Sequence, residues 1–232
     1  MVASAADAPA PGRNSRFRGL PLRILSAVVL GPLLLAAIWF GFPWIDLVAA
    51  VAAPLMIREW TQLTRGRPMI RLLAYVYALA ALIALLWLRH QPVLGRETVI
   101  WIIVCIWATD IGAYFVGASA GGAKLAPRIS PSKTWSGLIG GMAWAATASA
   151  AMGFVFGLGT TLSLAVIGAC MAVVGQLGDL AESAAKRGAG VKDSGNLIPG
   201  HGGLLDRVDG LVAVLVAVAL VRLTVDGAWP WT

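Results

Sequence analysis

The chain has 232 residues, of which 59% are hydrophobic and only 12% are charged, and its mean hydropathy is +0.81. This composition excludes an ordinary soluble domain, because such domains carry about 25% charged residues. A net charge of +7 also occurs in nucleic-acid-binding proteins, but here the basic residues lie between apolar segments, as in the cytoplasmic loops of membrane proteins. We therefore expect no nucleic-acid partner.

Apolar segments long enough to cross a bilayer recur along the chain, so the sequence predicts an all-α, polytopic integral membrane protein with about seven transmembrane helices. A bilayer core of roughly 30 Å needs about 20 helical residues. Helices also pair their own backbone polar groups in lipid. The predicted spans cover residues 24–42, 44–57, 70–88, 98–117, 137–157, 162–179 and 210–225.

The predicted organisation has three parts. Residues 1–20 form a disordered basic tail. Residues 21–97 form the N-terminal transmembrane helices; a cleaved signal peptide is the alternative for the first span, which is long and ends without a clear cleavage motif. Residues 98–232 form a second transmembrane region with polar loops at 121–136 and 180–209. Segment 44–57 is short and either crosses the bilayer or re-enters it.

The predicted orientation places the N-terminus in the cytoplasm. If all seven spans cross, fifteen Lys and Arg residues lie on the cytoplasmic side and only Arg89 and Arg96 on the far side. Such an asymmetry is the usual mark of membrane orientation. Loops 121–136 and 180–209 then face the cytoplasm, where nucleotides are found. We expect a multi-pass protein of the cell (inner) membrane.

Two pairs of carboxylates mark the ends of neighbouring spans. Asp179 and Glu182 are three residues apart, as are Asp206 and Asp209. Residues at this spacing share a helical face, so the two pairs can converge on one point. Carboxylates so close repel one another unless a cation lies between them, and hard oxygen ligands favour Mg²⁺. The alternative is a structural ion-pair network with nearby cations, namely Lys186, Arg187 or Arg207.

A glycine-rich turn lies between the two acidic pairs. Gly200, Gly202 and Gly203 surround His201. Glycines allow backbone amides to approach phosphate oxygens, although such a sequence is more often only a turn. Neighbouring cations would neutralise a polyphosphate: Lys186, Arg187 and Lys192. His201 is either a proton carrier or a structural hydrogen-bonding residue.

Upstream, two further features point to the same chemistry. Asp110 lies in an apolar span, where a carboxylate is costly and is a functional candidate unless it reaches the interface. The loop that follows combines hydroxyls with cations, including Ser130, Lys133 and Thr134, a composition that suits phosphate binding but also an ordinary solvated loop. Together these features indicate metal-assisted phosphoryl or nucleotidyl transfer to a lipid at the membrane surface.

The charged run resembles a known family signature. From Ser183 to Asp209 the chain has the pattern SxxKRx4KDSx2LIPGHGGxxDRxD, which is similar to the signature of phosphatidate cytidylyltransferases, and residues 110–114 and 130–137 resemble the same family. The resemblance implies that CTP and phosphatidate give CDP-diacylglycerol and pyrophosphate, with Mg²⁺ as cofactor. It also implies a homodimer.

The resemblance implies roles for individual residues. The expected metal ligands are Asp179, Asp206 and Asp209, supported by Glu182. The expected triphosphate ligands are Lys186, Arg187, Lys192 and residues 200–203. Ser130, Lys133 and Thr134 are expected to position a phosphate, and Asp110 to complete the site. Asp193 and Arg207 belong to the same run and are expected to bind substrate. The attacking phosphate is already anionic, so no strong general base is required.

Two alternatives remain open from the sequence. The first is a CTP-dependent transferase acting on another lipid phosphate or an isoprenoid alcohol, because the apolar surfaces that discriminate lipids leave no sequence motif. The second is an ion transporter that uses Asp110 and Asp179 as an ion path, although it leaves the phosphate-suited loops unexplained.

Overall fold

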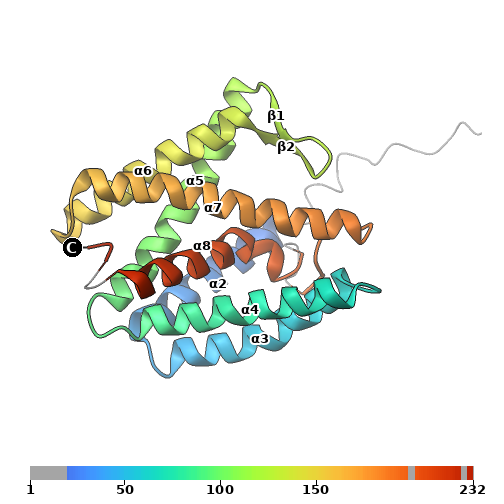
Figure 1. Cartoon of the computed structure of the whole chain (residues 1–232), viewed down its shortest axis with the longest axis horizontal. Helices are drawn as coiled ribbons and strands as arrows, with labels where there is room; N and C mark the ends of the chain where they lie inside the picture. Colours follow the sequence, from blue (N-terminus) through green and yellow to red (C-terminus); the bar gives the residue numbers. More distant parts are fainter. Residues whose placement is uncertain (1–19, 198–201, 226–228, 232) are drawn as a thin grey trace, which may run out of the picture.

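The computed structural model describes residues 20–197, 202–225 and 229–231, with side chains described from residue 28 (Figure 1). The predicted tail, residues 1–20, lies outside this range except for Leu20. Within the described residues the protein is mostly helical, as predicted. The elements are α2 (Leu20–Phe40), α3 (Trp44–Leu63), α4 (Pro68–Arg89), α5 (Gly95–Ala120), β1 (Lys124–Ala126), β2 (Ser130–Thr134), α6 (Trp135–Phe156), α7 (Thr161–Gly188) and α8 (Leu205–Thr224).

Four helices in the described part are long and apolar enough to cross a membrane, namely α4, α5, α6 and α7. The protein is therefore a polytopic membrane protein. The described apolar part of α2, Val28–Phe40, is shorter. Helices α3 and α8 have about the length of a span, but each carries several charged residues. Of the roughly seven expected spans, the described residues thus confirm four.

The all-α expectation was wrong for one segment. Residues expected to form a polar loop contain an antiparallel hairpin, in which Lys124 pairs with Thr134 and Ala126 with Ser130. The strands have only three and five residues, and the longer one contains Pro131. So short a pair has no sustained alternation of apolar and polar residues, which is the sequence signal for a strand. The hairpin connects α5 to α6 and holds Lys133 in β2.

Several predicted helix ends were also wrong. Helix α3 continues to Leu63 instead of ending at residue 57, α7 continues to Gly188, and α8 begins at Leu205. The predicted loop 180–209 is therefore shortened to residues 189–204. Hydropathy falls where a helix leaves the bilayer, but the helix itself continues, because Glu182 and Lys186 pair one turn apart. Both acidic pairs consequently lie on helices.

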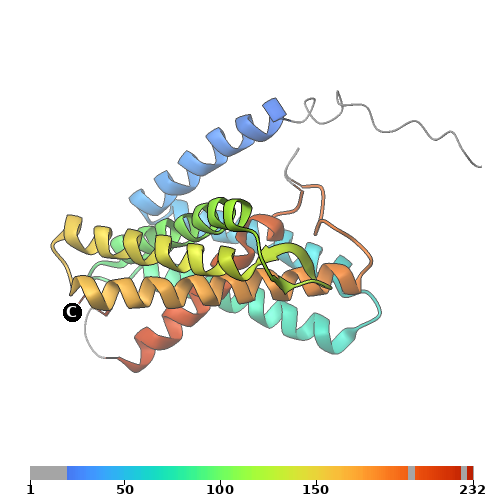
Figure 2. The ribbon, with the colours of Figure 1, turned by 90° about the horizontal axis from the view of Figure 1, so that it is seen from above.

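The connections segregate to the two ends of the bundle (Figures 1 and 2). At one end, Arg67 after α3 donates to Gly188 O of α7 at 2.8 Å, and Arg187 donates to Ile129 O of the hairpin turn at 3.2 Å. At the other end, Asp46 pairs with His90 at 3.1 Å. The hairpin and segment 189–197 thus share one end with the turn between α3 and α4.

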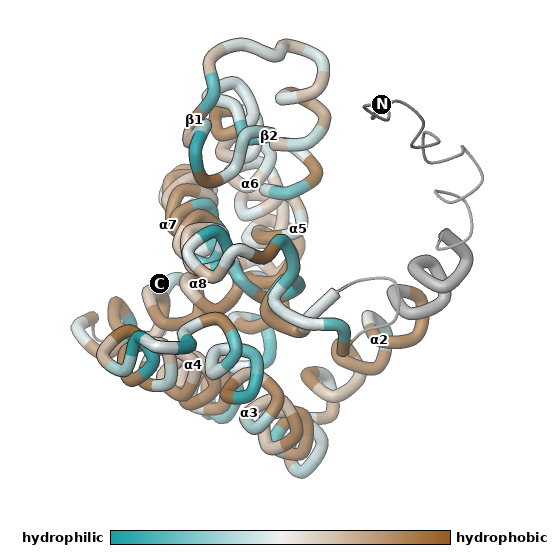
Figure 3. Tube along the Cα trace, turned by 90° about the vertical axis from the view of Figure 1, so that its right-hand side faces the viewer, coloured by the Kyte–Doolittle hydropathy of each residue, from teal (hydrophilic) through white to brown (hydrophobic). Residues whose placement is uncertain are grey.

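Helices α5, α6 and α7 approach closely because glycines lie at their contacts. A Cβ on Gly112 of α5 would lie 2.6 Å from the Trp144 side chain of α6, and one on Gly168 of α7 would lie 2.6 Å from Ala145 O. Small residues permit such packing between membrane helices. The outward faces are largely hydrophobic, and hydrophilic residues gather in the hairpin and helix ends (Figure 3). Exposed side chains such as Phe154 and Leu162 suit a lipid environment.

Candidate active site

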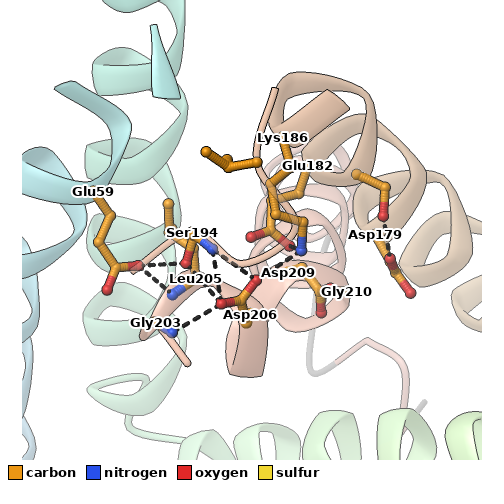
Figure 4. A network of polar contacts seen from close by, with 12 residues as sticks. Glu59, Asp179, Glu182, Lys186, Ser194, Gly203, Leu205, Asp206, Asp209 and Gly210 are labelled. Carbon is orange, nitrogen blue, oxygen red and sulfur yellow. Dashed lines mark hydrogen bonds and ion pairs between the residues drawn. The ribbon is translucent and has the colours of Figure 1, made fainter. Parts of the chain in front are cut away.

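The polar residues of several elements meet where the C-terminal turns of α7 approach the N-terminal turns of α8 (Figure 4). Glu182 and Lys186 come from α7, Asp206 and Asp209 from α8, and Ser194 from the segment that joins them. Asp179 and Glu182 of α7 lie near Asp206 and Asp209 of α8, as the sequence predicted. The structure also brings in groups that the sequence did not identify.

Asp206 is the centre of one hydrogen-bond network. Its carboxylate accepts bonds from Lys186 Nζ at 2.7 Å, from Ser194 N at 2.9 Å and from Gly203 N at 2.8 Å. Burial disfavours the charged carboxylate, but the bonds from Lys186 and from the two amides outweigh it, so the pKa of Asp206 lies below its usual value. In this arrangement Asp206 is an ionised hub that fixes the segment before α8.

Glu59 of α3 was not identified from the sequence, yet it anchors the same segment. Its carboxylate is 4% exposed and accepts from Ser194 Oγ at 2.8 Å, from Leu204 N at 2.8 Å and from Leu205 N at 2.9 Å. The first N–H groups of a helix have no partner within it, so Glu59 caps α8 from a distant helix. The sequence gives no signal for this capping role, because Glu59 belongs to a polar stretch that resembles a surface turn.

Two glycines of the predicted glycine-rich turn are described, and both are required by close contacts. Gly202 has φ +89°, a conformation that other residues rarely adopt. A Cβ on Gly203 would lie 2.6 Å from Glu59 Oε2 and would also collide with Ser194 Oγ. The two glycines therefore let the chain pass between Glu59 and Asp206. Gly200 and His201 lie outside the described residues.

Asp179 belongs to a second group of polar residues, nearer the hairpin. It forms an ion pair with Lys133 of β2, and its other oxygen accepts from Ser183 Oγ at 3.2 Å. The strand that precedes α6 thus holds Lys133 beside the C-terminal half of α7. The sequence placed Lys133 and Asp179 in separate roles, as a phosphate ligand and a metal ligand, and the structure brings them together.

Glu182 and Asp209 link the two groups. Glu182 is 3% exposed, and neither of its oxygens has a hydrogen-bond partner in the described residues. Its closest cation is Lys186, whose Nζ lies 3.4 Å from Oε2. Asp209 interacts electrostatically with both Asp179 and Glu182. The two acidic pairs therefore converge. Lys133 neutralises Asp179 in one pair, and Lys186 neutralises Asp206 in the other.

Two adjoining cavities lie beside these carboxylates. The larger, of about 310 Å³, is lined by residues of α5, β2, α6 and α7, including Asp110, Tyr114, Lys133 and Asp179. The smaller, of about 20 Å³, is lined by Asp110, Asp179 and Asp209 together with Thr109 and Gln176. A cavity of that size holds about one water molecule. Three carboxylates, from α5, α7 and α8, therefore line one cavity about the size of a water molecule.

The donor set of the small cavity fits Mg²⁺. The lining supplies carboxylate, amide and hydroxyl oxygens, which are the hard ligands that Mg²⁺ prefers. Among the described residues, no three His, Cys, Asp or Glu side chains are close enough to enclose an ion by themselves. Mg²⁺ rarely needs such a cage, because it usually keeps several waters and binds one or two carboxylates plus substrate phosphates. Of the predicted ligands, Asp179 and Asp209 line this space and Asp206 is engaged elsewhere.

The other predicted site residues have varied surroundings. Thr134 is buried and caps α6 by accepting from Gly137 N at 3.0 Å. Arg187 donates to the backbone oxygens of Ile129 and Val191, each at 3.2 Å. Ser130 begins β2, and Arg207 lies exposed in the first turn of α8. Lys192 and Asp193 are exposed in the segment between α7 and α8.

Comparison with known proteins gives consistent matches. Residues 66–225 match the cytidylyltransferase family. A phosphatidate cytidylyltransferase of Brucella melitensis is 44% identical over 179 residues, which are 77% of this chain and 64% of that relative. One of Rickettsia bellii is 37% identical over 208 residues, covering 86% of this chain and 89% of the relative. One of Pseudomonas aeruginosa is 41% identical over 189 residues, covering 81% and 67%. This chain thus spans 64% of the length of the Brucella relative.

Proposed function

Because this chain belongs to the cytidylyltransferase family, we propose that it transfers the cytidylyl group of CTP to phosphatidate, giving CDP-diacylglycerol and pyrophosphate for phospholipid synthesis. A phosphate oxygen of phosphatidate attacks the α-phosphorus of CTP and forms a new P–O bond. The bond from the α-phosphorus to the bridging oxygen of the β-phosphate breaks, and pyrophosphate leaves with the electron pair. The attacking oxygen is already an anion, so no residue has to remove a proton from it.

One observation carries this proposal. Asp110, Asp179 and Asp209 line one small cavity, and Lys133 pairs with Asp179 at its edge. Phosphoryl-transfer enzymes depend on positioning and charge stabilisation, for which carboxylates that hold a metal and a nearby cation are the usual means. An ion path would not require a lysine directly beside its carboxylates.

We assign Mg²⁺ to Asp179 and Asp209, with Asp110, Gln176 and Thr109 around it. When bound there, Mg²⁺ supplies a positive charge that stabilises the phosphate oxygens of the reaction. Lys133 orients the anionic phosphate of the lipid, since it lines the larger cavity. Lys186 holds Asp206 and lies beside Glu182, so it keeps the acidic cluster partly neutral before substrate binds.

The cavity of about 310 Å³ is the proposed site for the phosphatidate head group. Its lining combines Lys133 and Thr134 with apolar or aromatic groups from α5 and α6, including Tyr114 and Leu138. Tyr114 is 71% exposed on the surface of the bundle. A lipid whose phosphate binds Lys133 would place its acyl chains along this apolar face. Acyl chains can lie there because the helices pair their own backbone polar groups.

The proposed topology has seven crossings with the N-terminus and the active site on the cytoplasmic side of the cell (inner) membrane. Its basis is the excess of Lys and Arg at the end of the bundle that holds the hairpin and segment 189–204. On this topology CTP reaches the site from the cytoplasm.

Resemblance to the family is the basis for proposing a homodimer, and the mass of the protein in nanodiscs would test it.

The test is pyrophosphate release from CTP by purified protein with phosphatidate, with and without Mg²⁺, compared with Asp179→Asn. The proposal expects release that needs both phosphatidate and Mg²⁺ and is lost in the variant. Release with another lipid phosphate or an isoprenoid alcohol, but not with phosphatidate, would replace the proposed substrate. Folded protein that releases no pyrophosphate, yet conducts ions in liposomes without CTP, would overturn the enzyme assignment.

A further inference from the structure

A second large cavity is lined by Glu59, which is linked to Asp206 through Ser194 Oγ. Its volume is about 340 Å³, within the range of small-molecule sites. The walls come from α3 and from the segment before the glycine-rich turn: Leu55, Arg58, Glu59, Gln62, Gly195, Asn196 and Leu197. The reaction steps described above use none of these residues, and Glu59 has only the role of fixing the start of α8. The cavity therefore has room and polar walls without an assigned ligand.

The polar groups in this cavity are available to a ligand. Within the described part of the chain, the side chains of Arg58, Gln62 and Asn196 make no hydrogen bond or ion pair. A carboxylate has about four acceptor positions. Glu59 uses three of them, two on Oε2 and one on Oε1. One acceptor on Glu59 thus remains, and the same cavity is lined by Arg58, whose guanidinium can only donate.

We propose that this cavity binds the cytosine base of CTP; the proposal rests on the proposed function and specifies its nucleotide site. Cytosine presents an amino donor next to two acceptors, N3 and O2. A carboxylate accepts from the cytosine amino group, as it does in protein–nucleic acid complexes. Arg58 donates to the ring acceptors, and the amides of Gln62 and Asn196 can donate or accept. Uracil has a carbonyl oxygen in place of the amino group, and Glu59 repels it.

The position of the cavity suits a nucleotide that ends at the acidic cluster. Glu59 is joined to Asp206 through Ser194 Oγ, which lies 2.8 Å from the Glu59 carboxylate and 3.1 Å from that of Asp206. Lys186 then follows at 2.7 Å from Asp206. The base at α3 would therefore lie on one side of this network. Glu59, which lines this cavity, and Asp179, which lines the lipid cavity, lie on opposite sides of Asp206 in Figure 4.

The experiment measures Kd for CTP, UTP and pyrophosphate with Arg58→Ala/Gln62→Ala protein in detergent, beside the parent protein. Arg65→Ala is the matched control, because Arg65 is an exposed cation just after α3 that does not line the cavity. We expect the double variant to raise the Kd of CTP about tenfold or more, the scale of losing a base contact. We expect the parent protein to bind UTP more weakly than CTP. In the double variant the Kd values of UTP and pyrophosphate should change by less than about threefold, since a group that reads the base does not bind the phosphates.

Three results would overturn the inference. One is an unchanged Kd for CTP in folded double variant. Another is an equal loss of CTP and pyrophosphate affinity, which would make Arg58 a phosphate ligand. The third is equal CTP and UTP affinity in the parent. Failure of the proposed function is distinguishable, because it is the absence of pyrophosphate release in the parent protein whatever nucleotide it binds.

Discussion

The carboxylate of Glu59 accepts a hydrogen bond from Ser194 Oγ at 2.8 Å, although the two residues are 135 positions apart in the sequence. The same carboxylate accepts the amides of Leu204 and Leu205. A helix outside the charged signature thus fixes the point at which α8 begins.

Glu59→Gln should destabilise the protein. The carboxamide nitrogen cannot accept hydrogen bonds, so a buried donor among Ser194 and the first amides of α8 loses its partner, at a cost of about 1–3 kcal/mol. For a chain of this size, the apparent Tm should fall by about 2–4 °C per kcal/mol. Thermal unfolding in detergent, followed by tryptophan fluorescence, measures it.

Asp46→Asn is the control for that experiment. Asp46 is a partly exposed acidic residue at the opposite end of the bundle, where it pairs with His90. An exposed substitution of this kind usually changes stability by no more than about 0.5 kcal/mol. A Glu59→Gln protein that melts with the Asp46→Asn protein would contradict the capping role of Glu59.

Lys133→Ala should lower kcat/KM for phosphatidate. Lys133 is the cation of β2 that pairs with Asp179 at the larger cavity. Loss of one charged donor to a reacting phosphate typically costs about 100-fold or more in rate. Pyrophosphate release measures this, with Lys124→Ala as the control, because Lys124 is an exposed cation in the same hairpin that lines neither cavity. Equal losses in the two variants would mean that hairpin charge, not Lys133 itself, matters.

Asp209→Asn should raise the concentration of Mg²⁺ needed for half-maximal activity. Asp209 lines the small cavity with Asp110 and Asp179. Removal of one anionic group beside a metal typically weakens its affinity by about 10–100-fold. A Mg²⁺ titration of pyrophosphate release measures the shift, and chelation of Mg²⁺ should abolish release by the parent protein. An unchanged Mg²⁺ requirement in active Asp209→Asn protein would move the metal away from this cavity.

Gly203→Ala should disrupt the segment before α8. A Cβ there would lie 2.6 Å from Glu59 Oε2, and it would separate Glu59 from Ser194. We expect a loss of about 1–3 kcal/mol, the usual cost of forcing atoms into a packed site. Thermal unfolding checks this against Gly31→Ala in α2, where an added Cβ meets nothing within 4 Å. If both variants melt with the parent, the segment is looser than these contacts require.

Much of the site was predictable because its charged residues stand out in an apolar chain. Asp179, Glu182, Asp206 and Asp209 were identified from their spacing, and the structure brings the two pairs together. The ion-pair interpretation holds for Asp206, which Lys186 neutralises, and the metal interpretation stays a prediction for the cavity that Asp209 lines. The sequence could not assign these partners, because spacing along one helix does not determine which residue of another helix it meets.

The sequence by itself determined the membrane environment, the helical class and the family, since apolar runs and a long charged motif are local properties of the chain. Tertiary structure alone decided that Lys133 lies beside Asp179 and that Glu59 supports the segment before α8. The physical reason is that a buried carboxylate needs hydrogen-bond donors, and packing determines which donors lie beside it. Those donors belong to residues up to 146 positions away, so no local pattern records them.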